Sequence, residues 1–347
     1  MSSPDVIIAG AGIIGVSIAL ELRRRGAHVL ILERGQPGGE ASSAAAGMLA
    51  PADPETPPKL GPLARASAQL YAEYVGAIEG SSGMSVDFRR QGTIAFSESP
   101  PAPPPYRPLS PPELAEMEPA LAGRGREAFF VQDNSIDPAL LVRAAVAAAK
   151  LRGIEVRSNS SARGFRGRGG VIEVDTGSER LSARSLVDCR GAWSGPPVRP
   201  RKGQSLYVQP KRASLLGHVI AAPEVYLVPR SSGKILIGAT VEDVGYDKTV
   251  EPETVERLYR AAVELAPELA SATVTESWAG LRPGTPDNLP ILGETEIPGV
   301  FIASGHFRNG ILLAPVTARI MADLVTKKPV PLDISAFSPH RFAATKA

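Results

Sequence analysis

A glycine-rich segment near the N-terminus has the residue types and the spacing that bind a dinucleotide. Residues 10–15 are G-A-G-I-I-G, and Glu33 follows about 20 residues further on. Gly10 permits a tight turn, Gly12 lets a pyrophosphate approach the backbone, and Gly15 lets a helix pack closely on a strand. The carboxylate of Glu33 can accept hydrogen bonds from a ribose and would repel a 2′-phosphate. The segment therefore predicts a bound dinucleotide, but it does not distinguish FAD from NAD.

The elements on either side of this segment must aim its backbone N–H groups at the ligand. Residues 5–9 predict a buried strand, residues 13–25 a helix that stops at Gly26, and residues 27–32 a second strand. Together they form a strand–helix–strand unit of about 30 residues, so the two strands are expected to be parallel. The helix N-terminus then presents free N–H donors and the positive end of its dipole to a pyrophosphate. A glycine-rich turn that binds no nucleotide is the less favoured alternative.

The rest of the chain departs from this alternation of strand and helix and later returns to it. Further helices are predicted over residues 60–80, 138–152, 252–265 and 311–326. Further strands are predicted over residues 91–96, 154–157, 171–175, 186–190, 206–209, 225–229, 234–239 and 299–303, with a glycine-rich turn over residues 164–170. Eight prolines in residues 100–112 predict a surface loop of polyproline character rather than a helix or a central strand.

This order of elements predicts a fold class of α/β and α+β. A Rossmann-like nucleotide-binding domain would carry an inserted antiparallel-sheet substrate domain. The nucleotide-binding domain is expected to be discontinuous and to comprise residues 1–85, 138–200 and 276–347. The substrate-binding domain is expected to comprise residues 86–137 and 201–275.

The overall composition narrows the class of protein. The chain has 347 residues and a formal net charge of +2, which does not suggest a nucleic-acid or membrane-surface protein. Cys189 is the single cysteine and the four histidines lack metal-ligand spacing, so neither a disulfide framework nor a metal site is expected. The apolar run at residues 6–20 is too short for a membrane span, and it follows an acidic residue, unlike a signal peptide. We expect a cytoplasmic protein.

Three further stretches resemble a known family. They are residues 34–51, R-G-Q-P-G-G-E-A-S-S-A-A-A-G-M-L-A-P, residues 277–286, S-W-A-G-L-R-P-G-T-P, and residues 305–315, G-H-F-R-N-G-I-L-L-A-P. Together with the N-terminal glycine motif, they resemble the D-amino acid oxidase family of FAD-dependent oxidoreductases. The resemblance is greatest to the glycine oxidase branch, which serves thiamine thiazole biosynthesis, and it runs over most of the chain.

The resemblance implies a non-covalently bound FAD. The stretch of small residues would lie along the flavin through Ala41, Ser42, Ala46, Gly47 and Met48. Glu33 and Arg34 would hold the adenosine side, and the backbone near Ala162 would contact the adenine. The expected cofactor set is completed by Gly10, Gly12, Ile13, Ile14, Gly15, Gly191, His306, Arg308, Asn309, Gly310, Ile311 and Leu312.

The last predicted helix has an expected role beside the flavin. It begins just after Arg308, Asn309 and Gly310. Its N-terminus, aimed at the pyrimidine part of the flavin, would stabilise the negative charge of the reduced ring by roughly 0.3–2 kcal/mol. Pro315 is expected near the first turn, where a missing N–H costs least. His306 is expected to position the backbone near the flavin, because hydride transfer needs a deprotonated amine and good orientation rather than a general base.

The resemblance also implies three catalytic residues. Arg282 matches the residue that clamps the substrate carboxylate, and its planar guanidinium suits two parallel hydrogen bonds. Tyr226 matches the family tyrosine that hydrogen-bonds the same carboxylate, and Arg308 would add positive charge nearby in a looser role. The alternatives are structural: a salt bridge for either arginine, and a half-buried strand aromatic for Tyr226.

The implied reaction is the FAD-dependent oxidative deamination of glycine or of another small amine or D-amino acid. A hydride leaves the α-carbon for the flavin, the imine hydrolyses to a 2-oxo acid and ammonia, and O2 reoxidises the flavin to give H2O2. Thiazole synthase is a candidate partner, and a homo-oligomer is left open. The main alternative is an amine dehydrogenase for a proline- or sarcosine-like substrate that passes electrons to a quinone or a protein. A non-catalytic flavin or nucleotide binder and an NAD-dependent dehydrogenase explain fewer of the motifs.

Overall fold

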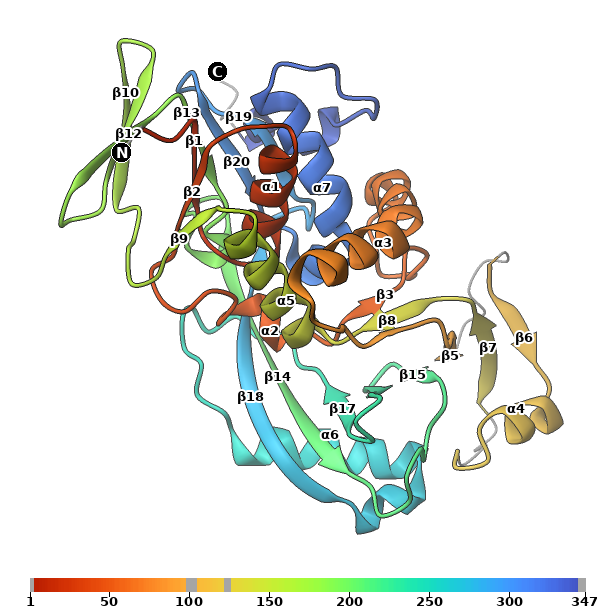
Figure 1. The fold of residues 1–347 in the computed structure, drawn as a ribbon. Coiled ribbons are helices and arrows are strands. Elements are labelled where there is room, and N and C mark those ends of the chain that lie inside the picture. Colours follow the sequence, from red (N-terminus) through yellow and green to blue (C-terminus); the bar gives the residue numbers. More distant parts are fainter. Residues whose placement is uncertain (1–2, 98–104, 122–125, 343–347) are drawn as a thin grey trace, which may run out of the picture.

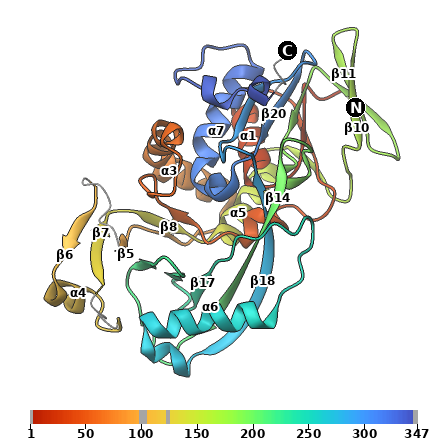
Figure 2. The same ribbon diagram turned by 180° about the vertical axis from the view of Figure 1, so that it is seen from behind.

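Two large sheets form the frame of the molecule, and helices pack on both of them (Figure 1). The structure is a computed structural model that describes residues 3–97, 105–121 and 126–342. Seen from behind, the eight-stranded sheet and its covering helix lie below the six-stranded sheet and its helices (Figure 2). The mixture of parallel and antiparallel sheets confirms the predicted fold class.

The six-stranded sheet is parallel apart from one edge strand. In spatial order its strands are β19 (Ile291–Glu294), β20 (Val300–Ser304), β13 (Ser185–Asp188), β1 (Val6–Ala9), β2 (Val29–Leu32) and β9 (Glu155–Arg157). β1 lies between β2 and β13, and Ile7 is in register with Leu30 and Leu186. β19 runs antiparallel to β20. The predicted parallel unit at the N-terminus is therefore confirmed.

The two faces of this sheet pack against different layers, because successive side chains of a strand point to opposite sides. Ile8 and Ile31 pack in one core with four helices, while Ile7 and Leu30 pack in another core with a small antiparallel sheet. The four helices are α1 (Ile13–Arg24), α3 (Gly61–Ser82), α5 (Pro138–Leu151) and α7 (Gly310–Val325). The small sheet consists of β10 (Gly164–Arg168), β11 (Val171–Asp175) and β12 (Arg180–Ala183).

The eight-stranded sheet has one face against helices and the other toward the first sheet. Its strands in spatial order are β18 (Thr273–Gly284), β14 (Arg199–Gln209), β17 (Ile235–Gly238), β16 (Tyr226–Pro229), β15 (Val219–Ala221), β5 (Thr93–Ser97), β7 (Glu127–Val131) and β6 (Arg107–Leu109). Helices α4 (Pro111–Met117) and α6 (Pro252–Leu265) share a buried apolar core with it. On the opposite face, Val228 and Leu236 pack against Ala46 and Met48.

A short sheet and a short helix lie between the two large sheets. The sheet consists of β3 (Met48–Leu49), β8 (Asn134–Ile136) and β4 (Phe88–Arg89), and the helix α2 spans Ala41–Ala44. These elements carry the stretch of small residues into the space between the sheets. They therefore bring it within reach of both β1 and the eight-stranded sheet.

Several sequence predictions of individual elements are confirmed closely. The helix expected over 252–265 is α6 with the same bounds. The carboxylate of Asp137 caps α5 by accepting hydrogen bonds from the N–H groups of Ala139 and Leu140 at 2.9 and 3.1 Å. The strand expected over 206–209 is the last part of β14, which begins earlier, at Arg199.

Two predicted loops are wrong in part. Within residues 100–112, Arg107–Leu109 form β6 and α4 begins at Pro111, while residues 98–104 lie outside the described residues. The prolines are tolerated because β6 is an edge strand and Pro111 is the first helical residue. The turn expected over 164–170 is also shorter, since residues 164–168 form β10.

The boundaries of the two domains stay a prediction. The strands β14 and β18 pair along their lengths, from Arg199 opposite Gly284 to Gln209 opposite Thr273. This pair crosses the expected boundaries at residues 200/201 and 275/276. It forms a long continuous connection between the two halves of the molecule.

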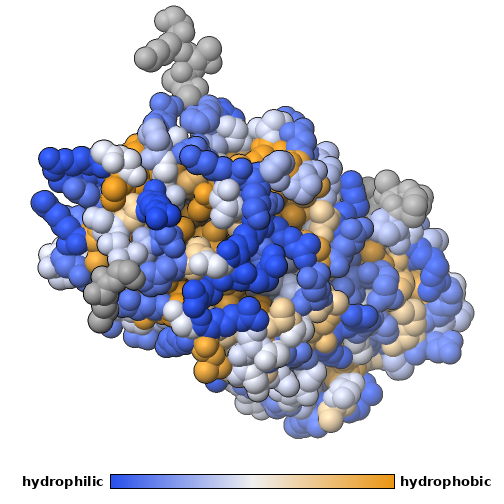
Figure 3. Space-filling view, turned by 45° about the horizontal axis from the view of Figure 1, so that its top comes forward, coloured by the Kyte–Doolittle hydropathy of each residue, from blue (hydrophilic) through white to orange (hydrophobic). Residues whose placement is uncertain are grey.

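One face of the molecule is mostly hydrophilic. On the face shown in Figure 3, hydrophilic residues cover most of the surface and hydrophobic residues form small patches between them. Among the described residues, none of the helices combines the length and the apolar character that crossing a bilayer requires.

Candidate functional site

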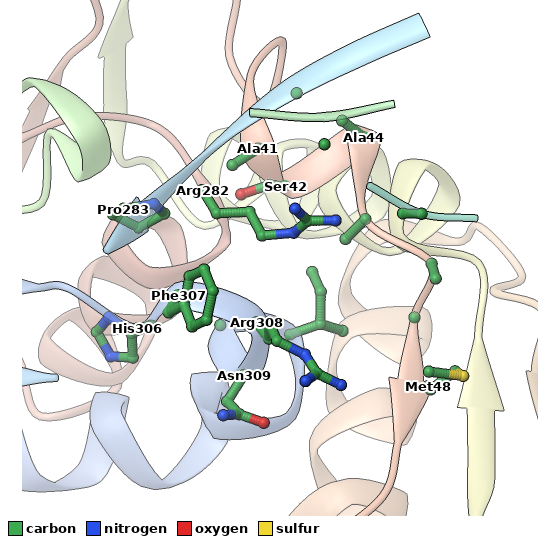
Figure 4. Close-up of a pocket in the computed structure, with 18 of the residues that line it drawn as sticks. Ala41, Ser42, Ala44, Met48, Arg282, Pro283, His306, Phe307, Arg308 and Asn309 are labelled. Carbon is green, nitrogen blue, oxygen red and sulfur yellow. The ribbon is translucent and has the colours of Figure 1, made fainter. Parts of the chain in front are cut away.

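A cavity of about 810 Å³ extends between the two large sheets. It is lined by the ends of β1 and β2, the stretch of small residues, the start of α7 and one face of the eight-stranded sheet. Its size lies toward the upper end of the roughly 300–1,000 Å³ usual for small-molecule sites. Figure 4 shows the part of the cavity where the stretch of small residues, β18 and the start of α7 approach one another.

The glycine motif forms the tight turn that its spacing predicts. Gly10 has φ +108°, and a Cβ there would lie 2.4 Å from the carbonyl oxygen of Cys189. A Cβ on Gly15 would lie 2.1 Å from the carbonyl oxygen of Gly10. Both positions therefore require glycine. Gly15 provides this close packing and is not among the residues that line the cavity, and its place among the cofactor residues stays a prediction.

The N-terminus of α1 opens toward the cavity beside two polar side chains. Glu33 accepts a hydrogen bond from the N–H of Ala11 at 2.8 Å, and Ser42 Oγ accepts one from the N–H of Ile13 at 2.9 Å. The N-cap residue, Gly12, has no side chain to cap the helix. The positive end of the helix dipole is thus aimed at the ligand space, as an anionic pyrophosphate requires.

The expected adenosine end contains an aromatic pair that the sequence analysis missed. The guanidinium of Arg34 lies 3.4 Å above the ring centre of Trp193, which stacks on Tyr246 at 5.6 Å. Arg34 also binds the carboxylate of Glu40 at 2.6 Å. Ala162 is buried at the cavity wall, as expected for an adenine contact. No spacing in the sequence links Arg34 with Trp193, because the contact joins positions far apart along the chain.

The stretch of small residues is held by side chains from the eight-stranded sheet. Trp278 Nε1 donates to the carbonyl oxygen of Ala44 at 3.1 Å. Arg230 is 5% exposed and donates to the carbonyl oxygens of Ala46 at 2.7 Å and Ile136 at 2.9 Å. Arg230 is a second residue that the sequence analysis missed. Its buried guanidinium fixes the backbone that would lie along the flavin.

The start of α7 offers uncapped N–H groups to the cavity. The helix follows a short 3-10 turn at Phe307–Asn309, and its N-cap Asn309 makes no side-chain cap. His306 is buried, and its Nε2 lies 3.1 Å from Thr317 Oγ1. Burial lowers the pKa of His306 to about 3, so the ring stays neutral at physiological pH. This arrangement supports a positioning role for His306.

Pro315 lies deeper in the helix than predicted. It is inside α7, past the first turn, where a missing N–H leaves a carbonyl without its helical partner. The hydroxyl of Tyr71 donates to the carbonyl oxygen of Ile311 at 2.9 Å, and Ser67 Oγ donates to that of Leu312 at 2.6 Å. These bonds from α3 provide hydrogen-bond donors to two buried carbonyl oxygens near the proline. Leu312 is buried in the helical core and is not among the residues that line the cavity, and its assignment as a cofactor residue stays a prediction.

Arg282 lies within β18. Its Nη1 donates to the carbonyl oxygen of Thr240 at 2.9 Å, and the guanidinium points into the cavity (Figure 4). A Cβ on Gly203 would lie 2.2 Å from this Nη1, so the glycine makes room for the guanidinium.

Tyr226 lies beside Arg282 in the cavity. Burial raises the pKa of the Tyr226 hydroxyl, and the charge of Arg282 and hydrogen bonds to Ser205 and Arg282 oppose that rise without cancelling it. The hydroxyl therefore stays protonated and can donate. A Cβ on Gly238 would come within 2.7 Å of this hydroxyl, so a second glycine clears the space around it.

Arg308 faces the same cavity but already has anionic partners. Its Nη2 binds Asp53 Oδ2 at 3.0 Å, and its Nη1 pairs with Glu55. Figure 4 shows the guanidiniums of Arg282 and Arg308 on opposite sides of the open space. Arg282 donates to backbone carbonyl oxygens and, in the described part of the chain, pairs with no acid, so it is the arginine with charge to spare for a carboxylate.

Two acids near Tyr106, the buried Asp133 and the half-buried Asp53, were not anticipated from the sequence. Asp133 is 5% exposed, and burial, followed by the nearby charge of Asp53, raises its pKa to about 7. Burial also raises the pKa of Asp53, against the lowering effect of Arg308. Burial and both acids raise the pKa of Tyr106 above its ordinary value. All three side chains line the cavity.

The raised pKa of Asp133 predicts a pH-dependent stability. Between its ordinary value of 3.8 and about 7, the folded protein keeps a proton that the unfolded chain loses, so this contribution to stability is lost as the pH rises through about 7. Asp133→Asn should therefore be more stable relative to wild type at pH 8 than at pH 4, measured as free energies of urea unfolding. Glu116→Gln removes an exposed acid from α4 and should show no such change. Equal pH profiles for wild type and Asp133→Asn would contradict the assignment.

The structure brings the remaining predicted residues together at one cavity. The predicted cofactor residues that line it are Gly10, Gly12, Ile13, Ile14, Glu33, Arg34, Ala41, Ser42, Ala46, Gly47, Met48, Ala162, Gly191, His306, Arg308, Asn309, Gly310 and Ile311. Arg282 and Tyr226 line it as well. Among the described residues, no group of three or more His, Cys, Asp or Glu is placed to hold a metal ion.

These features fit FAD. Two helix N-termini without side-chain caps open into one elongated cavity, one suited to the pyrophosphate and the other to a ring that gains negative charge on reduction. Glu33 stands at the end of β2, where a ribose is recognised in such folds. Cys189 is a buried thiol whose pKa burial raises well above its ordinary value, so it is not a reactive thiolate.

Comparison with known proteins gives consistent matches. The model of the family described as FAD dependent oxidoreductase matches residues 5–324. A glycine oxidase of Bacillus licheniformis is 34% identical over 362 residues, covering 97% of this chain and 97% of that protein. A bifunctional protein ThiO/ThiG of Trichormus variabilis is 35% identical over 364 residues, covering 97% of this chain and 55% of that protein. The chain thus spans about half the length of this bifunctional relative.

A solved structure has the same fold over nearly its whole length. The crystal structure of glycine oxidase from Geobacillus kaustophilus superimposes with a TM-score of 0.94 at 32% identity, covering 98% of this chain and 99% of that chain. The predicted resemblance is confirmed by the family match and by these relatives. The chain belongs to the D-amino acid oxidase family of FAD-dependent oxidoreductases.

Proposed function

We propose that the protein is an oxidase that converts glycine, or another small amine or D-amino acid, to an imine and then to a 2-oxo acid and ammonia, with formation of H2O2. The observation that carries the proposal is the position of Arg282 and Tyr226 in the same cavity as the dinucleotide-binding turn. The similarity to glycine oxidases above 30% identity supports glycine as the substrate and does not favour the amine dehydrogenase alternative.

The residues of the cavity have distinct tasks in this reaction. FAD, when bound, supplies the two-electron oxidation of the amine. Arg282 binds the substrate carboxylate with its free guanidinium edge, and Tyr226 donates a hydrogen bond to the same group. Residues of both large sheets line the cavity in which the substrate would lie. The N-terminus of α7 stabilises negative charge that develops beside it.

The relatives suggest where the product goes. Bifunctional ThiO/ThiG proteins join a segment similar to this chain to a second part of comparable length. We propose that the imine product supplies thiazole formation in thiamine biosynthesis, with thiazole synthase as the partner. We also propose a cytoplasmic location, which the absence of a spanning helix among the described residues permits.

One experiment tests the oxidase proposal directly. The purified protein is examined by visible absorption, and glycine is then added without oxygen. We expect a flavin spectrum that bleaches with glycine and recovers in air with formation of H2O2. A flavin spectrum that glycine does not bleach would exclude glycine and redirect the search to sarcosine, D-alanine and proline-like amines. A colourless protein that does not take up added FAD would contradict the cofactor assignment.

The close approach of Gly203 to Arg282 gives a second test of the site. Gly203→Ala is expected to lower kcat/KM for glycine by roughly 10- to 100-fold, because the added methyl group would displace the guanidinium from its position. The flavin spectrum should be unchanged. Gly76→Ala, in α3 where a Cβ meets no other atom within 4 Å, is the matched control and should keep normal activity. Normal activity of Gly203→Ala would show that glycine turnover does not require the guanidinium of Arg282 in this position.

A further inference from the structure

The cavity continues beyond the carboxylate clamp toward Asp53 and Asp133. Tyr226 is in register with Ala221 on β15, and Ala221 with Ala95 on β5. Two strand spacings separate Tyr226 from Ala95, a distance of roughly 10 Å. The methyl side chains of the two alanines leave open space above the sheet, and both residues line the cavity. A ligand held at the clamp therefore has room to extend across the sheet.

Asp53, Tyr106 and Asp133 form the far end of this space, here called the acidic end. Asp53 accepts hydrogen bonds from Arg308 at 3.0 Å and from the N–H of Glu55 at 2.9 Å. Tyr106 donates its hydroxyl proton to the carbonyl oxygen of Ala52 at 3.2 Å. Both side chains thus have partners within the protein.

Asp133 differs from its neighbours. It is 5% exposed, lines the cavity, and within the described ranges its carboxyl group has neither a hydrogen-bond donor nor a cation as partner. Buried polar groups are nearly always hydrogen-bonded, because leaving one unsatisfied costs free energy. An unpartnered carboxyl group that faces a ligand cavity is therefore a candidate contact for the ligand itself.

The charges around Asp133 determine whether an anionic or a cationic ligand group is favoured there. The charged group that acts on Asp133 is another acid, Asp53, whereas the effect of Arg308 falls on Asp53. A second carboxylate on the ligand would be repelled by this end of the cavity. An ammonium group would favour the ionised form of the Asp133 carboxyl group. It would then donate a charge-assisted hydrogen bond to that carboxylate.

We propose that the acidic end is a subsite for a positively charged amino group carried by the substrate at the end remote from its carboxylate. The substrate class is then extended to dipolar molecules whose carboxylate binds Arg282 and whose distal ammonium binds Asp133. Glycine fills only the clamp end of the same cavity. This inference rests on the proposed function for the role of Arg282 as the carboxylate clamp.

The proposal is tested by binding, so that it does not depend on turnover. The FAD-loaded enzyme is titrated by calorimetry with linear ω-amino carboxylates of four to eight carbons and with unsubstituted carboxylates of the same lengths. These ligands lack an α-amino group. At one or more lengths the ω-amino ligand is expected to bind about tenfold more tightly or better than its unsubstituted counterpart. A ratio near one at every length would overturn the proposal.

The variant Asp133→Asn locates the effect. It keeps the shape and removes the charge, so the preference for the ω-amino ligand should fall to about threefold or less. Glu116→Gln removes a negative charge from exposed α4 outside the cavity and should keep the wild-type preference. A preference that persists in Asp133→Asn would also overturn the proposal. The titrations measure binding and need no oxidation. A failure of the subsite proposal would therefore leave the bleaching of the flavin by glycine unaffected. If glycine does not bleach the flavin, the titrations can still be interpreted.

Discussion

Replacing Arg282 with alanine is expected to lower kcat/KM for glycine by the equivalent of about 2–5 kcal/mol of transition-state stabilisation. The substrate carboxylate would lose its cationic partner in a cavity where water gives little compensation. Arg308 cannot replace it, because that guanidinium is held by Asp53 and Glu55. The measurement is the steady-state rate of H2O2 formation over a range of glycine concentrations, with the flavin content of each preparation determined first.

Two further variants separate loss of the clamp from damage to the fold. Arg282→Lys keeps the charge without the planar pair of donors, so it should recover part of the lost activity. Arg201→Ala changes the residue that lies opposite Arg282 in the register of β14 and β18 and pairs with Asp243 outside the cavity. This control should retain near-normal activity and flavin content. A normal kcat/KM for Arg282→Ala would remove Arg282 from the proposed mechanism.

Local sequence signals were enough to predict the elements that position the cofactor. The glycine turn, α1 and β2 follow from a contiguous pattern, since Gly10 and Gly15 are each required by an atom of the adjacent strand or turn. The prediction failed where one local signal masked another. The prolines of residues 100–112 favoured the prediction of a loop over that of a helix. Ser110 and Glu113 nevertheless form a capping box, and α4 begins at Pro111, a first helical position where proline is favoured.

The contacts between distant segments could not be read from the sequence in the same way. Arg230 binds the backbone at Ala46, 184 positions earlier in the chain, and its sequence neighbours give no sign of this. The missing partner of Asp133 likewise becomes visible only when β5, β7 and the 50–57 loop are placed around one cavity. The family motifs identified Arg282 and Tyr226, whereas the glycines that clear space for them are recognised from the pairing of β14, β16, β17 and β18.

Behind the clamp, a fully buried lysine is expected to make a large contribution to stability. Lys202 lies on β14 with no exposed surface, and its Nζ is 3.2 Å from Glu242 and 3.5 Å from Glu251. Burial lowers its pKa, but hydrogen bonding to Glu242 and the charges of both acids outweigh burial and raise the pKa above the ordinary value. Lys202→Met is expected to lower the free energy of unfolding by about 3 kcal/mol, because Glu242 would lose its cation in a partly buried position.

The matched control for this prediction is Lys248→Met. Lys248 binds Glu40 at 3.1 Å, but both side chains are substantially exposed, so its removal should cost less than about 1 kcal/mol. Urea unfolding of both variants and the wild type, in the same flavin-loaded state, gives the comparison. Equal unfolding free energies for the two methionine variants would show that the buried ion pair contributes no more to stability than a surface pair.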